Sequence, residues 1–155
     1  AAFRTAQELG ITTILNPAPY QPLTDDLLEL TDWLIPNEIE FAELDKTHRA
    51  PDSDAVIASL RKTGRTIVTL GSDGAALVAA DGTVKRFAAK KVTATDTTGA
   101  GDCFIGAFAA ALASGATEES AVQFGIDCAT KSVTRKGAQS SYPKIEEIDF
   151  SLIVK

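Results

Sequence analysis

A short polar segment with two glycines leads directly into a run of small and apolar residues, and this junction is well suited to chemistry. Residues 95–104 read TDTTGAGDCF, and residues 105–113 are mostly apolar. The pattern predicts a loop followed by a buried helix. The first turn of such a helix has backbone N–H groups without partners, and the helix dipole favours negative charge there. We therefore expect an anion site at Gly99–Gly101.

Asp102 is the unusual residue at this junction. Its carboxylate is expected beside the free N–H groups, where a loop that only binds phosphate has no use for a second anion. A phosphotransferase does use one, because it must take a proton from an attacking hydroxyl beside the phosphoryl group that it transfers. The alternative is structural, since Gly-x-Gly often forms a tight turn before a helix and an early Asp often only compensates the helix dipole. Taken alone, the segment leaves both interpretations open.

The segment differs from two well-known nucleotide-binding loops. It is not followed by Gly-Lys-Ser/Thr, so it is not a Walker A loop. The third glycine of a dinucleotide fingerprint would fall at Phe104, and no strand is predicted to run directly into Gly99. The chain also lacks an early strand followed by Gly-x-Gly-x-x-Gly, which disfavours a nicotinamide-dependent oxidoreductase.

Five segments of the chain, in order, carry a resemblance to one family. Residues 96–104 are similar to the signature of the PfkB-type, ribokinase-like carbohydrate kinases. Residues 16–19 (NPAP), 36–40 (PNEIE), 69–74 (TLGSDG) and 133–139 (VTRKGAQ) also resemble ribokinase segments. The resemblance implies a kinase that transfers a phosphoryl group from ATP to a hydroxymethyl group of a small sugar, with ribose as the first candidate. A fructokinase or nucleoside kinase of the same family is an alternative.

The resemblance also assigns roles to the residues of the signature. In that family the terminal Asp is the catalytic base, and the Gly-Ala-Gly backbone forms the anion hole. Carried over to this chain, Asp102 contacts the substrate and accepts the proton of its hydroxyl. The backbone of Gly99, Ala100 and Gly101 then holds the charge that develops on the transferred phosphoryl group.

Asn37 and Glu40 lie three residues apart at the start of a predicted helix, so they share one face of it. Asn-x-x-Glu at this place is also the pattern of a capping box. In the ribokinase-like family it is a motif that acts on Mg²⁺ and the nucleotide phosphates, and Mg²⁺ needs few protein carboxylates. The resemblance thus assigns Glu40 to Mg²⁺, and it assigns five residues to the nucleotide: Asn37, Thr69, Gly71, Ser72 and Gly74. From the residues alone, 71–74 is equally a simple turn.

Asp96 and the loop at 135–141 resemble the monovalent-cation site of ribokinase. Asp96 offers a hard oxygen ligand, and carbonyl groups of a glycine-containing loop can supply others. The alternative for Asp96 is a loop residue that caps the following helix. The loop departs from the family pattern at the bulky Tyr142. The resemblance implies six K⁺ ligands, mostly through backbone oxygens: Asp96, Thr98, Ser132, Arg135, Gly137 and Ser141.

Composition narrows the remaining classes. The chain has 155 residues and a net charge of −6, without a cluster of Lys or Arg, so nucleic-acid and membrane-surface roles have little support. No apolar run approaches the roughly 20 residues of a membrane helix. Cys103 and Cys128 lie in apolar helical stretches and are expected to be buried free thiols of a cytoplasmic protein. His48 lies in a polar loop and is expected to be solvated.

Predicted strands and helices alternate, which indicates an α/β protein with a three-layer, Rossmann-like sheet and flanking helices. Strands are expected at 11–15, 33–35 and 66–70, with a hairpin of 75–80 and 83–88 across Asp81-Gly82. Helices are expected up to Gly10 and at 24–30, 37–44, 53–63, 100–114, 117–133 and near 145–152. The loops after Leu15, Ile35 and Leu70 leave strands at the edge where such sheets bind ligands.

The resemblance implies that residues 1–155 form a single nucleotide-binding domain, the C-terminal part of a ribokinase-like kinase that is incomplete at the N-terminus. The N-terminal half of the same kinase would carry most sugar contacts and a small β-sheet lid, and the complete enzyme would be a homodimer. A second hypothesis follows from this. The chain alone is a nucleotide-binding fragment that is inactive without its other half.

Overall fold

The structure is a computed structural model that describes residues 1–45, 47–60, 64–79 and 81–153. The chain packs as two compact units, each with its own interior. The first unit comprises Ala1–Gly71 with Ala76–Arg86, and the second comprises Ser72–Ala75 with Phe87–Lys155.

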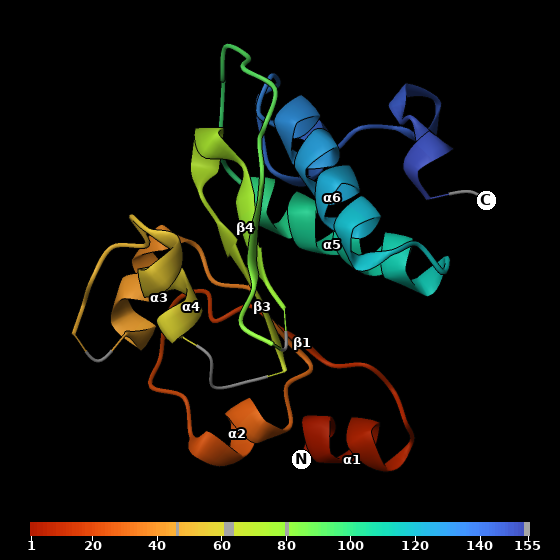
Figure 1. Cartoon of the computed structure of the whole chain (residues 1–155). Coiled ribbons are helices and arrows are strands. Elements are labelled where there is room, and N and C mark those ends of the chain that lie inside the picture. The colour runs from red at the N-terminus through yellow and green to blue at the C-terminus, as the bar shows by residue number, and fades with distance from the viewer. Residues whose placement is uncertain (46, 61–63, 80, 154–155) are drawn as a thin grey trace. The chain divides into compact units, whose positions relative to one another are not determined.

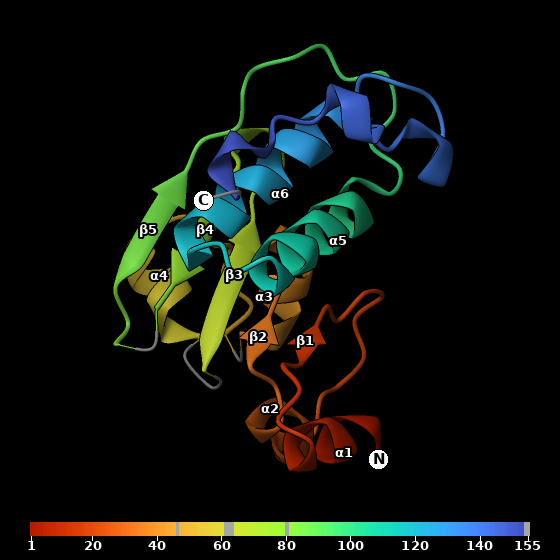
Figure 2. The same ribbon diagram turned by 90° about the vertical axis from the view of Figure 1, so that its right-hand side faces the viewer.

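Five strands lie side by side in chain order (Figure 2): β1 (Ile14–Leu15), β2 (Trp33–Leu34), β3 (Arg65–Thr69), β4 (Ala75–Val78) and β5 (Val84–Phe87). β1 pairs with β2, and β2 with β3, in parallel; Ile14 is opposite Trp33, and Trp33 is opposite Arg65. β4 and β5 form the predicted hairpin, in which the Ala79 N–H donates to the Thr83 carbonyl oxygen at 2.9 Å. The sheet is therefore mixed, with parallel strands followed by a hairpin.

Three of the four helices of the first unit within the described residues begin at a side-chain cap. The four are α1 (Ala2–Glu8), α2 (Asp25–Glu29), α3 (Glu38–Leu44) and α4 (Asp54–Ser59), of which the last three are capped, and α3 and α4 lie together beside the strands (Figure 1). The Thr24 side chain accepts from the Leu27 N–H, and Ser53 accepts from the Val56 N–H. The core of this unit joins apolar side chains of the helices and strands: Leu34, Phe41, Ile57, Val68 and Ala76 are all buried in it.

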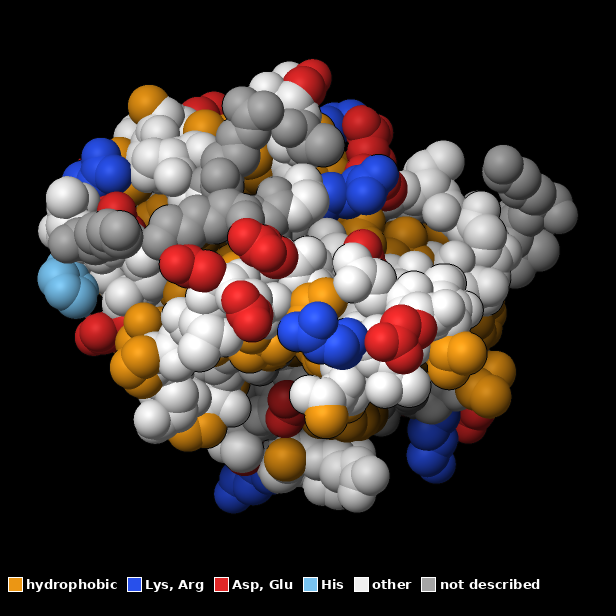
Figure 3. Space-filling model, turned by 90° about the horizontal axis from the view of Figure 1, so that it is seen from below, with side chains coloured by type: hydrophobic (Ala, Val, Ile, Leu, Met, Phe, Trp, Pro, Cys, Tyr) orange, Lys and Arg blue, Asp and Glu red, His pale blue; other side chains and the backbone are white. Residues whose placement is uncertain are grey.

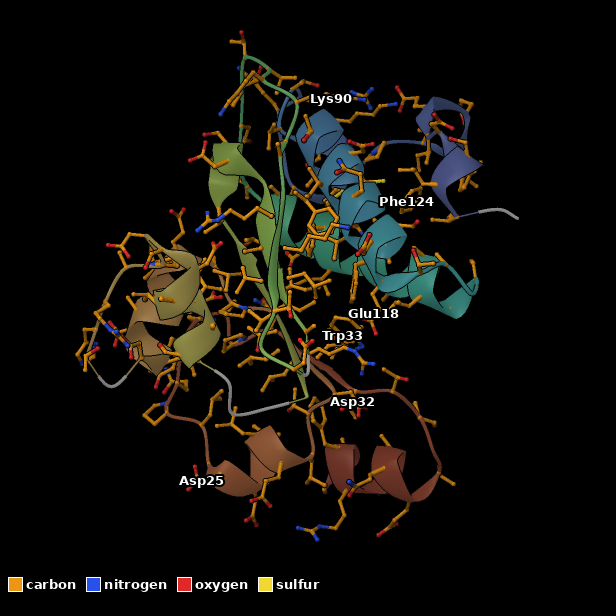
Figure 4. All side chains as sticks on the ribbon, viewed as in Figure 1. Asp25, Asp32, Trp33, Lys90, Glu118 and Phe124 are labelled. Carbon is orange, nitrogen blue, oxygen red and sulfur yellow. The ribbon has the colours of Figure 1, made fainter. Side chains whose placement is uncertain are left out.

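The second unit is built on a helix pair, α5 (Ala100–Ala113) and α6 (Glu118–Ser132), followed by three 3₁₀ turns: η2 (Gln139–Ser141), η3 (Ile145–Glu147) and η4 (Phe150–Leu152). The two long helices approach closely, because a Cβ built on Gly125 would lie 2.9 Å from the Phe104 ring. Phe124, labelled in Figure 4, meets Phe150 of η4 with ring centroids 6.0 Å apart. The end of the chain is thus packed against α6.

Two predicted elements differ from the structure. β1 begins at Ile14 rather than at residue 11, and the N–H of the buried Thr13 donates to the carboxylate of Asp32, which is labelled in Figure 4. The prediction of one helix near 145–152 is wrong, because Ile148 and Asp149 separate η3 from η4 in extended backbone. The Asp149 carboxylate accepts from the Ser151 N–H, which caps a single new turn.

Other predicted bounds shift by a few residues or cannot be followed. α4 ends at Ser59, and the rest of the helix expected at 53–63 includes 61–63, which lie outside the described residues. β4 ends at Val78, and residue 80 of the predicted strand also lies outside them. A further 3₁₀ turn, η1 (Gly71–Asp73), stands where a turn was predicted.

The burial of the two cysteines confirms the sequence prediction. Cys103 and Cys128 are buried free cysteines, and burial raises the pKa of Cys128 to about 11. In the described part of the chain, every helix is too short or too polar to cross a membrane. On the face drawn in Figure 3, basic side chains stand apart from one another among acidic and uncharged ones.

Candidate functional site

Polar residues that follow β1, β2 and β3 meet at one edge of the sheet in the first unit. The Asn16 side-chain amide donates to the Ile35 carbonyl oxygen at 2.8 Å and to the Glu40 carboxylate at 3.3 Å. Asn37, beyond the end of β2, forms a parallel bridge with Thr69, the last residue of β3. The loops after Leu15 and Ile35 and the end of β3 therefore lie together, as parallel topology predicts.

Asn37 and Glu40 form a capping box at the start of α3. The Asn37 Oδ1 accepts from the N–H groups of Ile39 and Glu40, both at 2.9 Å, and the Glu40 Oε2 accepts from the Asn37 N–H at 2.9 Å. The capping box that the sequence offered as the structural interpretation of this motif is thus present. It does not use the whole carboxylate, because Glu40 Oε1 has no hydrogen-bond partner among the described residues. Glu40 is 5% exposed, so the motif holds a buried carboxylate with one oxygen still available.

The turn at 71–74 begins beside this edge. Gly71 has φ +52°, and a Cβ built on it would lie 3.8 Å from the Glu38 carboxylate. Gly74 has φ +97°, and a Cβ there would lie 1.9 Å from the Phe87 carbonyl oxygen. No side chain fits at Gly74, because the backbone of β5 occupies the space.

A residue that the sequence analysis missed holds the same turn. The Lys91 ammonium donates to the Ser72 carbonyl oxygen and to the Asp73 carboxylate, both at 3.0 Å. Both side chains are largely exposed, so this contact orients the turn more than it stabilises the fold. Nothing in the sequence pairs Lys91 with a turn 18 residues before it.

The N-terminus of α5 has the arrangement of an anion site. Gly99 is the N-cap in left-handed backbone, with φ 76° and ψ 3°, and no side chain in the described ranges caps this helix. The Ala100 N–H donates to the Thr97 carbonyl oxygen at 3.2 Å, whereas the N–H groups of Gly101 and Asp102 have no acceptor in that part of the chain. Asp102 stands exposed in the same turn. Unpaired donors and one carboxylate therefore open to solvent at one place.

The second glycine-containing loop packs directly against this N-cap. A Cβ built on Gly99 would lie 3.1 Å from Ala138 and 3.2 Å from the Tyr142 hydroxyl oxygen. Only glycine combines the left-handed backbone with this close approach. The loop after α6 thus forms one wall beside the N-terminus of α5.

Asp96 joins these two loops. Its Oδ2 accepts from the Gly137 N–H at 2.9 Å, and its Oδ1 accepts from the Thr98 N–H at 3.0 Å. The Gly137 and Thr98 hydrogen bonds hold the pKa of the Asp96 carboxyl at about 2. Asp96 does not cap α5, because Thr98 precedes the helix. A carboxylate has about four lone-pair sites, so these contacts leave part of it available to a cation.

The other residues assigned to a cation use their side chains elsewhere. The Ser132 hydroxyl donates to the Ala129 carbonyl oxygen at 2.8 Å, and the Ser141 hydroxyl donates to that of Ala138 at 2.7 Å. The Arg135 guanidinium pairs with Glu147 and holds the pKa of that carboxyl at about 2. The described residues contain no group of three or more His, Cys, Asp or Glu side chains placed to hold a metal. A cation here would depend on Asp96 and on backbone carbonyl groups.

The Asp96 contacts give a prediction about stability and pH. Because the pKa of Asp96 is lowered from 3.8 to about 2 in the folded chain, its ionised form stabilises the fold above pH 4. This contribution is lost as the pH falls from about 4 to about 2. We expect Asp96→Asn to lower the melting temperature at pH 7 and to flatten its dependence on pH in that window. Thermal unfolding followed by circular dichroism measures both, with the exposed loop variant Asp52→Asn as the control. Equal pH dependence in wild type and Asp96→Asn would contradict the prediction.

Known proteins resemble nearly the whole chain. Residues 1–145 match the pfkB family of carbohydrate kinases. A ribokinase of Schizosaccharomyces pombe is 38% identical to the chain over 161 residues, which cover 99% of this chain and 51% of that protein. The chain thus spans about half the length of the curated relatives it matches.

Solved structures agree with this similarity. The structure of Arabidopsis thaliana ribokinase complexed with ribose and ATP matches with a TM-score of 0.86 and 29% identity, over 97% of this chain and 50% of that one. An Escherichia coli structure described as a ribokinase II in complex with ATP and Mg²⁺ matches with a TM-score of 0.77 and 27% identity, over 94% of this chain and 50% of that one.

Proposed function

Since this chain belongs to the pfkB family of carbohydrate kinases and has the ribokinase-like α/β fold, we propose that it provides the phosphoryl-transfer site of an ATP-dependent ribokinase. One observation carries the proposal. At the N-terminus of α5, the left-handed Gly99 leaves backbone N–H groups without acceptors, and Asp102 stands in the same turn. An anion-binding backbone beside a carboxylate suits transfer of a phosphoryl group to a hydroxyl.

In this proposal the chain's own groups divide the reaction between them. The Asp102 carboxylate accepts the proton of the sugar hydroxymethyl as its oxygen attacks the γ-phosphate. The backbone of Gly99–Gly101 holds the charge that builds up on the transferred oxygens, through the N–H groups that Thr97 does not occupy. Asp96 keeps the two loops together, so that these groups stay in place during the reaction.

The nucleotide and its metal are proposed to bind through the edge described above. Glu40 would hold Mg²⁺ through water, with Asn37, Thr69, Gly71, Ser72 and Gly74 beside the nucleotide. Support comes from the free Glu40 Oε1 and from the ATP and Mg²⁺ complex of the similar structure. When bound, Mg²⁺ neutralises charge on the phosphates. A K⁺ ion is proposed at Asp96 with backbone oxygens of Thr98, Ser132, Arg135, Gly137 and Ser141.

The proposed substrate is tested in an ADP-formation assay. The assay uses the full-length protein, in which this chain is joined to the half that its relatives also possess. We expect ADP to form in the presence of ATP, Mg²⁺ and ribose, in a one-to-one ratio with phosphorylated ribose. Deoxyribose, fructose and a nucleoside in the same assay report on the alternatives within the family. ADP formation that is independent of every acceptor would contradict the proposed function.

Residues 1–155 alone are expected to show negligible kinase turnover. The reason is that about half of each relative is absent from this chain, and the sugar contacts are proposed to lie there. The coupled ADP assay with equal amounts of the chain and the full-length protein measures the difference. Turnover by the chain within tenfold of the full-length rate would refute the prediction.

A further inference from the structure

Tyr142 places a hydroxyl group beside the N-cap of α5. It follows η2 and is half-buried, and a Cβ built on Gly99 would lie 3.2 Å from its hydroxyl oxygen. Over the described ranges, this hydroxyl has no hydrogen-bond partner in the protein. A half-buried phenol with an unused donor thus lies next to the backbone that carries the proposed anion hole.

The phenol faces the side of α5 that carries Asp102. Gly99, Asp102 and Cys103 are related by three and four positions, so they share one face of the helix. The pKa of Tyr142 is raised by burial first, and then by the charge of Asp102 and the Cys103 group. Tyr142 therefore keeps its proton at neutral pH and can act as a hydrogen-bond donor.

Contacts within the loop hold Tyr142 at this position. The Ser141 hydroxyl and N–H both donate to the Ala138 carbonyl oxygen, at 2.7 and 3.0 Å. Ala138 in turn packs against Gly99, and Gly137 donates to Asp96. These two contacts fix the loop beside the N-terminus of α5. The Tyr142 hydroxyl therefore lies there without any rearrangement of the loop.

We propose that the Tyr142 hydroxyl is an additional hydrogen-bond donor of the anion hole, donating to an oxygen of the phosphoryl group held at Gly99–Gly101. The inference rests on the proposed function and assigns a side chain to that same site. A donor already in place where charge develops stabilises the transition state without reorganisation. The backbone N–H groups provide the same kind of contact from the N-terminus of α5, whereas Tyr142 donates from the loop after α6.

The test uses Tyr142→Phe in the full-length protein, because phenylalanine keeps the ring against Gly99 and removes only the hydroxyl. We expect kcat for ribose phosphorylation to fall by about 10²-fold, as for the loss of one such donor, with the KM for ATP within about twofold. With Mg²⁺, ADP and ribose present, aluminium fluoride imitates the transferring phosphoryl group. The affinity of the protein for aluminium fluoride in this mixture should fall by a similar factor. The melting temperature should not change, whereas it would fall if the role of the hydroxyl were merely structural.

Tyr20→Phe is the matched control, since Tyr20 is the other tyrosine of the chain, and its aluminium fluoride affinity should stay at the wild-type value. Unchanged kcat and unchanged aluminium fluoride affinity in Tyr142→Phe would overturn the inference. A lower kcat with unchanged aluminium fluoride affinity would also overturn it, since the hydroxyl would then act on Asp102 rather than on the phosphoryl group. Asp102→Asn in the same assay reports on the proposed function separately, because it removes the base and leaves Tyr142 in place.

Discussion

Asp102→Asn in the full-length protein is expected to lower kcat by about 10²–10⁴-fold while ATP affinity stays near the wild-type value. Asparagine keeps the shape of the side chain and removes only its ability to accept a proton. Nucleotide binding should weaken little, and a tighter Kd is also consistent, because a negative charge near the γ-phosphate is gone. Steady-state kinetics with ribose and a binding titration with an ATP analogue measure the two effects.

Asp127→Asn is the control for this prediction. Asp127 lies on α6 in the same unit and, among the described residues, accepts only from the Gln123 side chain, so its substitution should leave kcat unchanged. A near-normal kcat in Asp102→Asn would return Asp102 to the structural interpretation, in which it compensates the helix dipole.

Gly99→Ala is expected to destabilise the protein and to lower kcat by about 10²-fold, comparable to the loss of a donor in an anion hole. Alanine in the left-handed region costs roughly 1–2 kcal/mol. Its Cβ would also lie 3.1 Å from the Ala138 Cα, so the wall of the site must move. Chemical denaturation gives the change in unfolding free energy, and the ribose assay gives kcat.

Gly101→Ala is the matched variant in the same loop. Gly101 has no positive φ, and a Cβ built on it meets nothing within 4 Å. It lies inside α5, where alanine is favoured over glycine by about 0.5–1 kcal/mol, so stability should stay the same or rise. Equal stability of the Gly99→Ala and Gly101→Ala proteins would contradict the account of the N-cap.

Helix starts could be predicted from the sequence because their causes are local. Thr24, Ser53 and Thr117 each cap a helix through an N–H three residues later, and Gly115 ends α5 in left-handed backbone. The start of β1 was not predictable in this way. The Thr13 N–H donates to the carboxylate of Asp32, a partner 19 residues away, although the Thr13 carbonyl oxygen still accepts from the Trp33 N–H of β2.

The same distinction applies to the site. The signature at Gly99–Asp102 is contiguous, so its chemistry could be predicted from residue types and from the resemblance. The hydrogen bond from Gly137 to Asp96 spans 41 residues, and sequence alone does not indicate that it occupies part of the carboxylate. The contacts of Lys91 and Tyr142 likewise depend on tertiary packing.

A crystal structure of the full-length protein with a non-hydrolysable ATP analogue and ribose tests the central claim most directly. The γ-phosphate oxygens are expected at the backbone N–H groups of Gly99–Gly101 that Thr97 does not occupy. The sugar hydroxymethyl oxygen is expected at about 2.6–3.2 Å from the Asp102 carboxylate. A γ-phosphate bound away from the N-terminus of α5, with Asp102 out of reach of any sugar hydroxyl, would contradict the claim.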